Sequence, residues 1–310
     1  MSELTETMIA KRPLHMLRDN PITRKELRSR MRGRRAFVVL TTYLVVMGLL
    51  ISLIYLAYAS AANQPYGPDP RQAGKAIFAA VVGVQIFLVI FMAPAFTAGA
   101  ITGEKERQTF DLLRTTLLPA NWFVMGKLLS SLSYVLLLII ASIPLQSIAF
   151  LLGGLSVEEL LISQVLIIIG AITFAMYGLF CSAHLGSTLA ASVATFGGAI
   201  FWTMGLPILL FMFIGFLGPL LFSSSAISWV GEAILALGAL LLASTNLPAS
   251  LIVSEVFLIE ENTLFFYKQN FSGHQVWLFS PWLLTVPLYL LAAWLLYWLA
   301  VRKVRKIAEK

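Results

Sequence analysis

Six long apolar runs contain no Asp, Glu, Lys or Arg, and this pattern restricts the chain to a membrane-spanning fold. A helix needs roughly 20 apolar residues to cross about 30 Å of hydrocarbon. The six runs that reach this length are 36–60, 76–101, 128–152, 160–181, 189–216 and 276–301. Backbone polar groups inside a bilayer must be bonded internally, which favours helices. The sequence therefore predicts an all-α integral membrane protein with six transmembrane helices.

Composition supports a bilayer rather than water as the solvent of this chain. Of its residues, 59% are hydrophobic and only 12% are charged. Soluble domains are about 25% charged, because their folds need a polar shell. We therefore expect residues 36–310 to form a single transmembrane domain, preceded by an arm at 1–35.

The charges are distributed unevenly between the segments that connect the apolar runs. The arm 1–35, the loop 102–127 and the tail 302–310 hold 19 Lys and Arg against 8 Asp and Glu, and the other connections hold 3 against 7. Lys and Arg are in excess on the cytoplasmic side of membrane proteins. We expect a multi-pass protein of the plasma membrane (the inner membrane of a bacterium), with both termini and the 102–127 loop in the cytoplasm. Topology and anionic lipid explain the basic surplus, so no nucleic-acid partner is expected.

The external region 217–275 is itself partly apolar and decides the number of spans. Ala226–Ala243 is long enough to cross, but one extra span would place the basic tail outside, against the charge rule. The stretch 251–267 carries three carboxylates, which disfavour a crossing: Glu255, Glu260 and Glu261. We favour six spans with a re-entrant or membrane-resting external helix pair. Eight spans is the alternative.

Two cytoplasmic segments have amphipathic patterns. Residues 20–35 are rich in Lys and Arg and predict an interfacial elbow helix on the inner leaflet. In 103–118, Arg107, Asp111 and Arg114 share one helical face, and an apolar stripe lies beside them. The stripe consists of Phe110, Leu113 and Leu117. Such a helix needs a surface to cover it, which is either a partner or the chain's own spans and lipid.

These two segments resemble the permease subunits of type-2 ABC transporters of the exporter-like class. The charged start of the family's motif is matched by Glu104, Glu106 and Arg107, its middle by Thr109, Leu112 and Leu113, and its end by Gly126 and Lys127. Two departures stand out. Gln108 replaces the usual Gly, and Thr116-Leu117 replaces the usual Thr-Pro. The span layout and the long outer region also fit the family.

The resemblance implies a division of labour between subunits. The permease would form the substrate path, and two copies of a separate ABC ATPase would hydrolyse ATP with Mg²⁺. This chain contains no GxxxxGK[ST] phosphate loop, so we expect it not to be an enzyme and to hold no cofactor itself. The coupling segment would dock on the ATPase through ten residues: Glu104, Glu106, Arg107, Thr109, Phe110, Asp111, Leu112, Leu113, Arg114 and Leu117.

Two further patterns suggest sites inside the membrane. Small residues recur every fourth position in the fifth span, and such a face allows close helix approach: Gly186, Ala190, Ala194 and Gly198. This face could contact a second permease, identical or related, or could pack within the chain. Gln85 and Gln146 could line the substrate path or could form hydrogen bonds between helices.

Two other functional classes fit the sequence less well. An ion-coupled secondary transporter usually places ionisable residues at mid-membrane, and the six runs contain no Asp, Glu, Lys, Arg or His. An intramembrane enzyme needs a nucleophile–base pair or a His and carboxylate cluster. The sequence contains no HExxH or GxSxG motif, and its three His are dispersed. No metal site or catalytic residue is therefore expected.

Overall fold

The computed structural model describes residues 34–62, 69–108, 119–209, 211–212, 216, 229–260, 263–271 and 273–308. In this part of the chain, six helical stretches are long and apolar enough to cross a membrane. Four of these stretches lie within single helices, and the second and fifth begin in α5 and α10 and continue beyond them. The six helices are α4 Arg34–Ala62, α5 Pro70–Ala98, α8 Ala120–Leu151, α9 Val157–His184, α10 Thr188–Ile200 and α14 Trp282–Ala308. The mostly helical, six-span fold is thus confirmed. The predicted interfacial helix at 20–35 lies largely outside the described residues, which begin at Arg34.

Two spans have boundaries that differ from the predicted ones. The third begins at Ala120 rather than at 128, because Pro119 occupies the N-cap position and Lys127 is accommodated inside the helix. The last begins at Trp282 rather than at 276, because 276–279 belongs to a β-strand. The predicted 102–127 loop is shorter, because α8 already begins at Ala120. The charge of Lys127 placed this residue in the predicted loop, but in the structure an ion pair balances that charge inside the helix.

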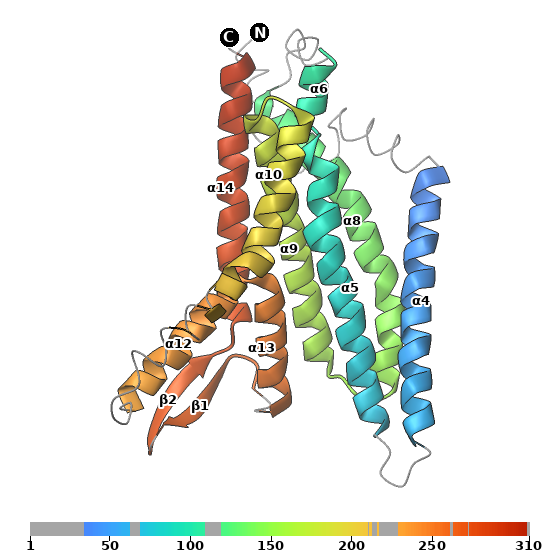
Figure 1. The fold of residues 1–310 in the computed structure, drawn as a ribbon, viewed down its shortest axis with the longest axis vertical. Helices are drawn as coiled ribbons and strands as arrows, with labels where there is room; N and C mark the ends of the chain where they lie inside the picture. The colour runs from blue at the N-terminus through green and yellow to red at the C-terminus, as the bar shows by residue number, and fades with distance from the viewer. Residues whose placement is uncertain are drawn as a thin grey trace, which may run out of the picture.

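Helix α9 lies at the centre of the bundle, between α5, α8, α10 and α14 (Figure 1). Gly178 allows α9 to approach α5 closely, because a Cβ at this position would overlap Thr97 and Pro94. Gly170 in the same way makes room for the side chain of Leu247. The outer helices are less covered: only 11% of the most apolar part of α4 and 22% of that of α14 are buried. Their remaining apolar surface suits contact with lipid.

The external region forms two short helices and a hairpin. Helices α12 (Trp229–Thr245) and α13 (Leu247–Glu260) meet at Asn246 and return to the same end of the bundle (Figure 1). With 17 and 14 residues, they are about 26 and 21 Å long, too short to cross the hydrocarbon. This agrees with six spans rather than eight, and the helix pair is the one that we expected to be re-entrant or membrane-resting.

A two-stranded antiparallel sheet follows, and the sequence analysis did not predict it. Strand β1 (Phe266–Phe271) pairs with β2 (His274–Phe279), and Gly273 takes a positive φ of 91° in the turn between them. Alternate residues of the hairpin pack against α12 and α13, namely Tyr267, Phe271, Val276 and Leu278. Isolated hairpins are marginal in stability, so this packing is what supports the strands.

The fifth span contains a π-helical turn, η1, at Phe201–Gly205. Pro207 follows it and has no N–H, so it cannot bond the carbonyl of Thr203 in the α pattern or that of Trp202 in the π pattern. The Nδ2 group of Asn246 donates to both carbonyls, at 3.1 Å to Trp202 and 3.0 Å to Thr203. The turn between the re-entrant helices therefore supplies the bonds that proline removes from the fifth span.

Other neutral polar groups complete this buried turn, which we call the apex (Ser244–Asn246). The Trp202 indole N–H and the Tyr289 hydroxyl both donate to the Thr245 carbonyl, at 3.0 and 3.1 Å. Thr285 donates to the Ser244 carbonyl and lies 2.6 Å from the Ser250 hydroxyl. Irregular backbone at membrane depth is tolerated only when its polar groups are bonded within the protein. The apex meets that condition through η1, α13 and α14.

Candidate functional site

A short helix, α6 (Thr102–Glu106), follows α5 after a break at Gly99–Ile101. The stretch that includes both, Arg71–Glu106, has 36 residues, which corresponds to about 54 Å of helix. That length exceeds the roughly 30 Å hydrocarbon layer. Since α6 lies at the end of this stretch, we place it beyond the apolar layer, at the end of the bundle where α14 also terminates (Figure 1).

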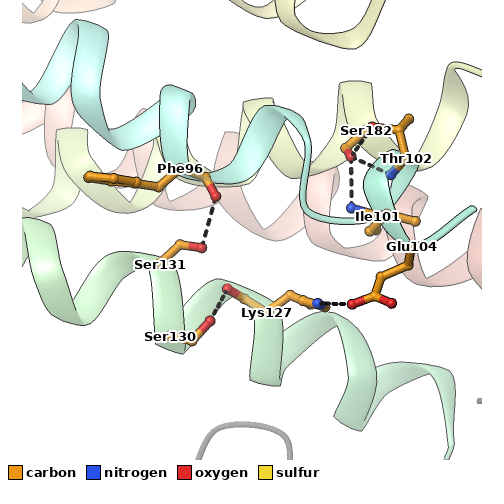
Figure 2. A network of polar contacts seen from close by, with 8 residues as sticks. All are labelled: Phe96, Ile101, Thr102, Glu104, Lys127, Ser130, Ser131 and Ser182. Carbon is orange, nitrogen blue, oxygen red and sulfur yellow. Dashed lines mark hydrogen bonds and ion pairs between the residues drawn. The ribbon is translucent and has the colours of Figure 1, made fainter. Parts of the chain in front are cut away.

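Ser182 of α9 holds the start of α6. Its buried hydroxyl oxygen accepts hydrogen bonds from the backbone N–H groups of Ile101 and Thr102, at 2.9 and 3.0 Å (Figure 2). The first N–H groups of a helix have no partner within it and need an outside acceptor. A side chain from another helix thus does the work of an N-cap and ties α6 to α9.

An ion pair links α6 to α8. The Lys127 ammonium lies 2.9 Å from the Glu104 carboxylate, and the two side chains are 8% and 29% exposed (Figure 2). Lys127 also lies over the ring of Phe123, at 5.8 Å from the ammonium to the ring centroid. A nearly buried ammonium requires a charged partner, so Glu104 is needed for Lys127 to occupy this position.

Glu106 connects α6 to α10. One carboxylate oxygen accepts from the Thr188 backbone N–H and the other from its hydroxyl, both at 2.7 Å. Thr188 is the first residue of α10, so the carboxylate sits where the helix dipole favours negative charge. Lys105 adds a bond from its ammonium to the Ala183 carbonyl, at 3.0 Å, near the end of α9. Helix α6 is therefore bonded to three transmembrane helices.

Gln108, which stands where the similar family usually has Gly, follows α6 and has an unusual backbone conformation. Gln108 has φ = +56°, and among the described residues it is the only non-glycine with a positive φ. This left-handed conformation favours glycine, because a Cβ there approaches the backbone. The structure thus explains why glycine would be usual at this position.

The predicted coupling residues are only partly described. Glu104 and Glu106 lie in α6 with the contacts given above, and Arg107 follows the helix with an exposed side chain. The others lie outside the described residues: Thr109, Phe110, Asp111, Leu112, Leu113, Arg114 and Leu117. Their grouping on helical faces therefore stays a prediction.

The small-residue face of α10 divides into two parts. Gly186, Ala190 and Ala194 are exposed in this single chain, whereas Gly198 lies against the ring of Tyr177 in α9. The Tyr177 hydroxyl donates to the Ala194 carbonyl at 3.1 Å. Contact with a second permease stays a prediction for the exposed part, and Gly198 has an intrachain neighbour.

Gln85 and Gln146 are fully buried and bond to each other and to Gln164. The Gln146 amide donates to the Gln85 carbonyl oxygen at 2.9 Å, and the Gln164 amide donates to the Gln146 oxygen at 3.0 Å. Gln85 also donates to the Ser142 hydroxyl at 2.5 Å. This cluster joins α5, α8 and α9 through side-chain hydrogen bonds. A role in lining a substrate path stays a prediction.

Sequence reasoning missed Ser182, Lys105 and Thr188 as contributors to the site. The sequence analysis gave none of the three a role. Ser and Thr side chains often bond backbone groups of neighbouring residues, but nothing in the sequence indicates which distant N–H or carboxylate they meet. Their roles depend on the packing of α9 and α10 against α6.

Together these features define a multi-pass membrane protein in which the short charged helix α6 is bonded to three of the spans. A family model described as ABC-2 type transporter matches residues 20–204, which is more than half of the chain. The chain belongs to this family and is an ABC transporter permease. A search of curated proteins finds no match.

Proposed function

We propose that this chain is the permease of an ATP-driven exporter that couples to a separate ABC ATPase through residues 103–118. The observation that supports this most is the bonding of α6 to α8, α9 and α10. A push on α6 would be transmitted to three spans at once, because each link is a short hydrogen bond or ion pair. Two ATPase copies would bind ATP and Mg²⁺ and drive two permeases between inward-open and outward-open states.

The proposed orientation places α6 and the end of α14 in the cytoplasm. Helix α14 ends at the same end of the bundle as α6 (Figure 1), and its last turns carry Arg302, Lys303, Arg305 and Lys306. The opposite end carries carboxylates such as Glu158 and Glu232 beside few basic residues. This distribution follows the positive-inside rule, and the exporter would then reside in the plasma membrane.

The coupling proposal can be tested by affinity purification of the tagged chain from its native host. The wild type should bring down a vanadate-sensitive ATP hydrolysis activity. Leu113→Asp would place a charge in the predicted apolar stripe, and Arg107→Glu would reverse a charge beside α6. Both should lower the co-purified activity several-fold, because a docking surface loses its buried contact or its charge match.

Glu158→Lys is the matched control, since Glu158 is exposed at the opposite end of the bundle. It should retain the co-purified activity at the wild-type level. Full recovery of the ATPase with Leu113→Asp and Arg107→Glu would contradict the assignment of the docking segment. A wild-type preparation without ATP hydrolysis would contradict the proposal that an ATPase binds this chain.

A further inference from the structure

A cavity of about 300 Å³ lies between α9, the π turn and α14. Its wall includes aromatic side chains from all three elements: Phe174, Tyr177, Phe201, Trp202 and Tyr289. Pockets that hold small molecules have volumes of about 300 to 1,000 Å³ and are lined mainly by apolar and aromatic groups. The cavity therefore has the size and lining of a ligand site, and none of its lining residues belongs to α6.

The polar groups of the wall are already used within the protein. The Trp202 N–H and the Tyr289 hydroxyl donate to the Thr245 carbonyl, and the Tyr177 hydroxyl donates to the Ala194 carbonyl. The Thr173 hydroxyl lies within bonding distance of the Ile169 and Tyr289 carbonyls. None of the described lining residues carries a charge. A polar ligand would lose its hydration without gaining a donor, so the lining selects an uncharged hydrocarbon group.

The cavity is continuous with the apolar outer surface of the bundle. Phe201 and Leu288, which line it, are 51% and 42% exposed, and α10 and α14 are among the least covered spans. A void next to this surface forfeits dispersion contacts unless something fills it. The material in contact with such a surface in a membrane is the acyl chain of lipid.

We infer that this cavity binds the acyl chain of a lipid from the surrounding bilayer. The acyl chain enters between α10 and α14 and packs on Phe201, Trp202 and Tyr289. Trp202 and Tyr289 also donate to the Thr245 carbonyl of the apex, so the bound acyl chain supports the groups that position the re-entrant helices. This inference depends on the membrane location of the chain and not on its ATPase partner.

Photolabelling of the full chain, reconstituted into phosphatidylglycerol and phosphatidylethanolamine vesicles, tests the inference. The probe is a phospholipid with a diazirine near the end of one acyl chain, and mass spectrometry locates its adducts. Adducts should be enriched at 201–202 and 288–296 over the residues of α4, although α4 is the more exposed helix. A matched probe with the diazirine in the headgroup should not label these positions.

Ala292 lines the cavity, so Ala292→Phe should fill it and lower the cavity adducts by roughly threefold or more, because the chain loses its contacts. Leu291→Phe is the control, since Leu291 is 65% exposed and points outside the lining. Ala292→Val, a smaller change, should give an intermediate loss and covers the case in which the Phe variant fails to fold. Size-exclusion profiles identify folded variants.

Two results would overturn the inference. One is equal labelling of the cavity and α4 that no Ala292 variant changes. The other is a cavity without adducts that instead forms cysteine crosslinks between two copies at position 288, which would show that a second chain fills it.

Discussion

The α6 network and the apex solve the same physical problem with different chemistry. Both sit at helix breaks that leave backbone groups without partners, at Gly99–Ile101 and at Pro207. Around α6 the partners include charged side chains, and Glu106 is exposed. At the apex the partners are amides, hydroxyls and an indole, and Asn246 is 4% exposed while Thr285 and Ser250 are fully buried.

The difference follows from the solvent at each place. Charges are tolerated where water reaches them, but inside hydrocarbon their desolvation costs more than their attraction returns. Neutral donors can satisfy carbonyls there without that cost. Water and salt can reach the exposed contact of Glu106 with Thr188, which suits the coupling role that we propose for this segment. The apex has no such competitor, so we expect it to be the more rigid of the two.

The largest expected effect is at the apex, with Asn246→Ala. The change leaves the carbonyls of Trp202 and Thr203 without the Asn246 donor, and an unpaired buried group costs about 1 to 3 kcal/mol. The variant should therefore unfold at a clearly lower temperature in detergent, as followed by size exclusion after heating. Asn270→Ala is the control, because Asn270 is exposed in the hairpin turn and accepts one bond from Gly273. Equal unfolding temperatures for Asn246→Ala and Asn270→Ala would contradict the stabilising role of the apex.

The second effect is at the α6 network, with Ser182→Ala. Two buried N–H groups, of Ile101 and Thr102, lose their acceptor, for a cost of about 1 to 3 kcal/mol. Asn246→Ala removes more bonds, because Asn246 also accepts from the Ala249 backbone N–H. Thermal unfolding should show a smaller drop than for Asn246→Ala. Ser192→Ala provides the reference, since Ser192 only donates to a carbonyl of its own helix. A drop larger than that of Asn246→Ala would reverse the ranking of the two networks.

The two networks also differ in how far the sequence could reveal them. The basic residues around α6 and the family-like motif predicted a functional segment there, with Glu104 and Glu106 as coupling residues. The structure bonds them to Lys127 and Thr188, and their coupling role stays a prediction. The apex was predicted only as a re-entrant pair. Asn246 attracted no attention because an isolated Asn between apolar runs is also typical of a simple turn. Its role depends on Pro207, which is 39 positions away and adjacent only in the folded chain.

The smallest effect is at Gln108, where glycine should be accepted without loss. Its φ of +56° strains a side chain, so Gln108→Gly should raise stability by roughly 0.5 to 1 kcal/mol. Gln108→Val should lower stability, because a β-branched residue is the least tolerant of this conformation. Denaturation curves of the two variants and the wild type give the sign of each change in stability. A stabilising Val would show that the residue does not keep its positive φ.

The sequence by itself determined the solvent, the six spans and the basic end of this permease. These follow from hydrophobicity and net charge, which are sums over nearby residues and need no knowledge of contacts. It also limited the external region to an even number of crossings. It could not determine the hairpin, because alternation in a short apolar stretch is also consistent with a helix end or the beginning of a span.

Only the tertiary structure decided which polar groups meet. Ser182 reaches α6 across 80 positions of sequence, and Glu106 reaches Thr188 across 82. Trp202 and Tyr289 converge on one carbonyl and also form the wall of the lipid cavity. Each side chain has ordinary chemistry taken alone. Its function arises from the few ångströms that separate it from a backbone group left unpaired elsewhere, and that distance is set by how the helices pack.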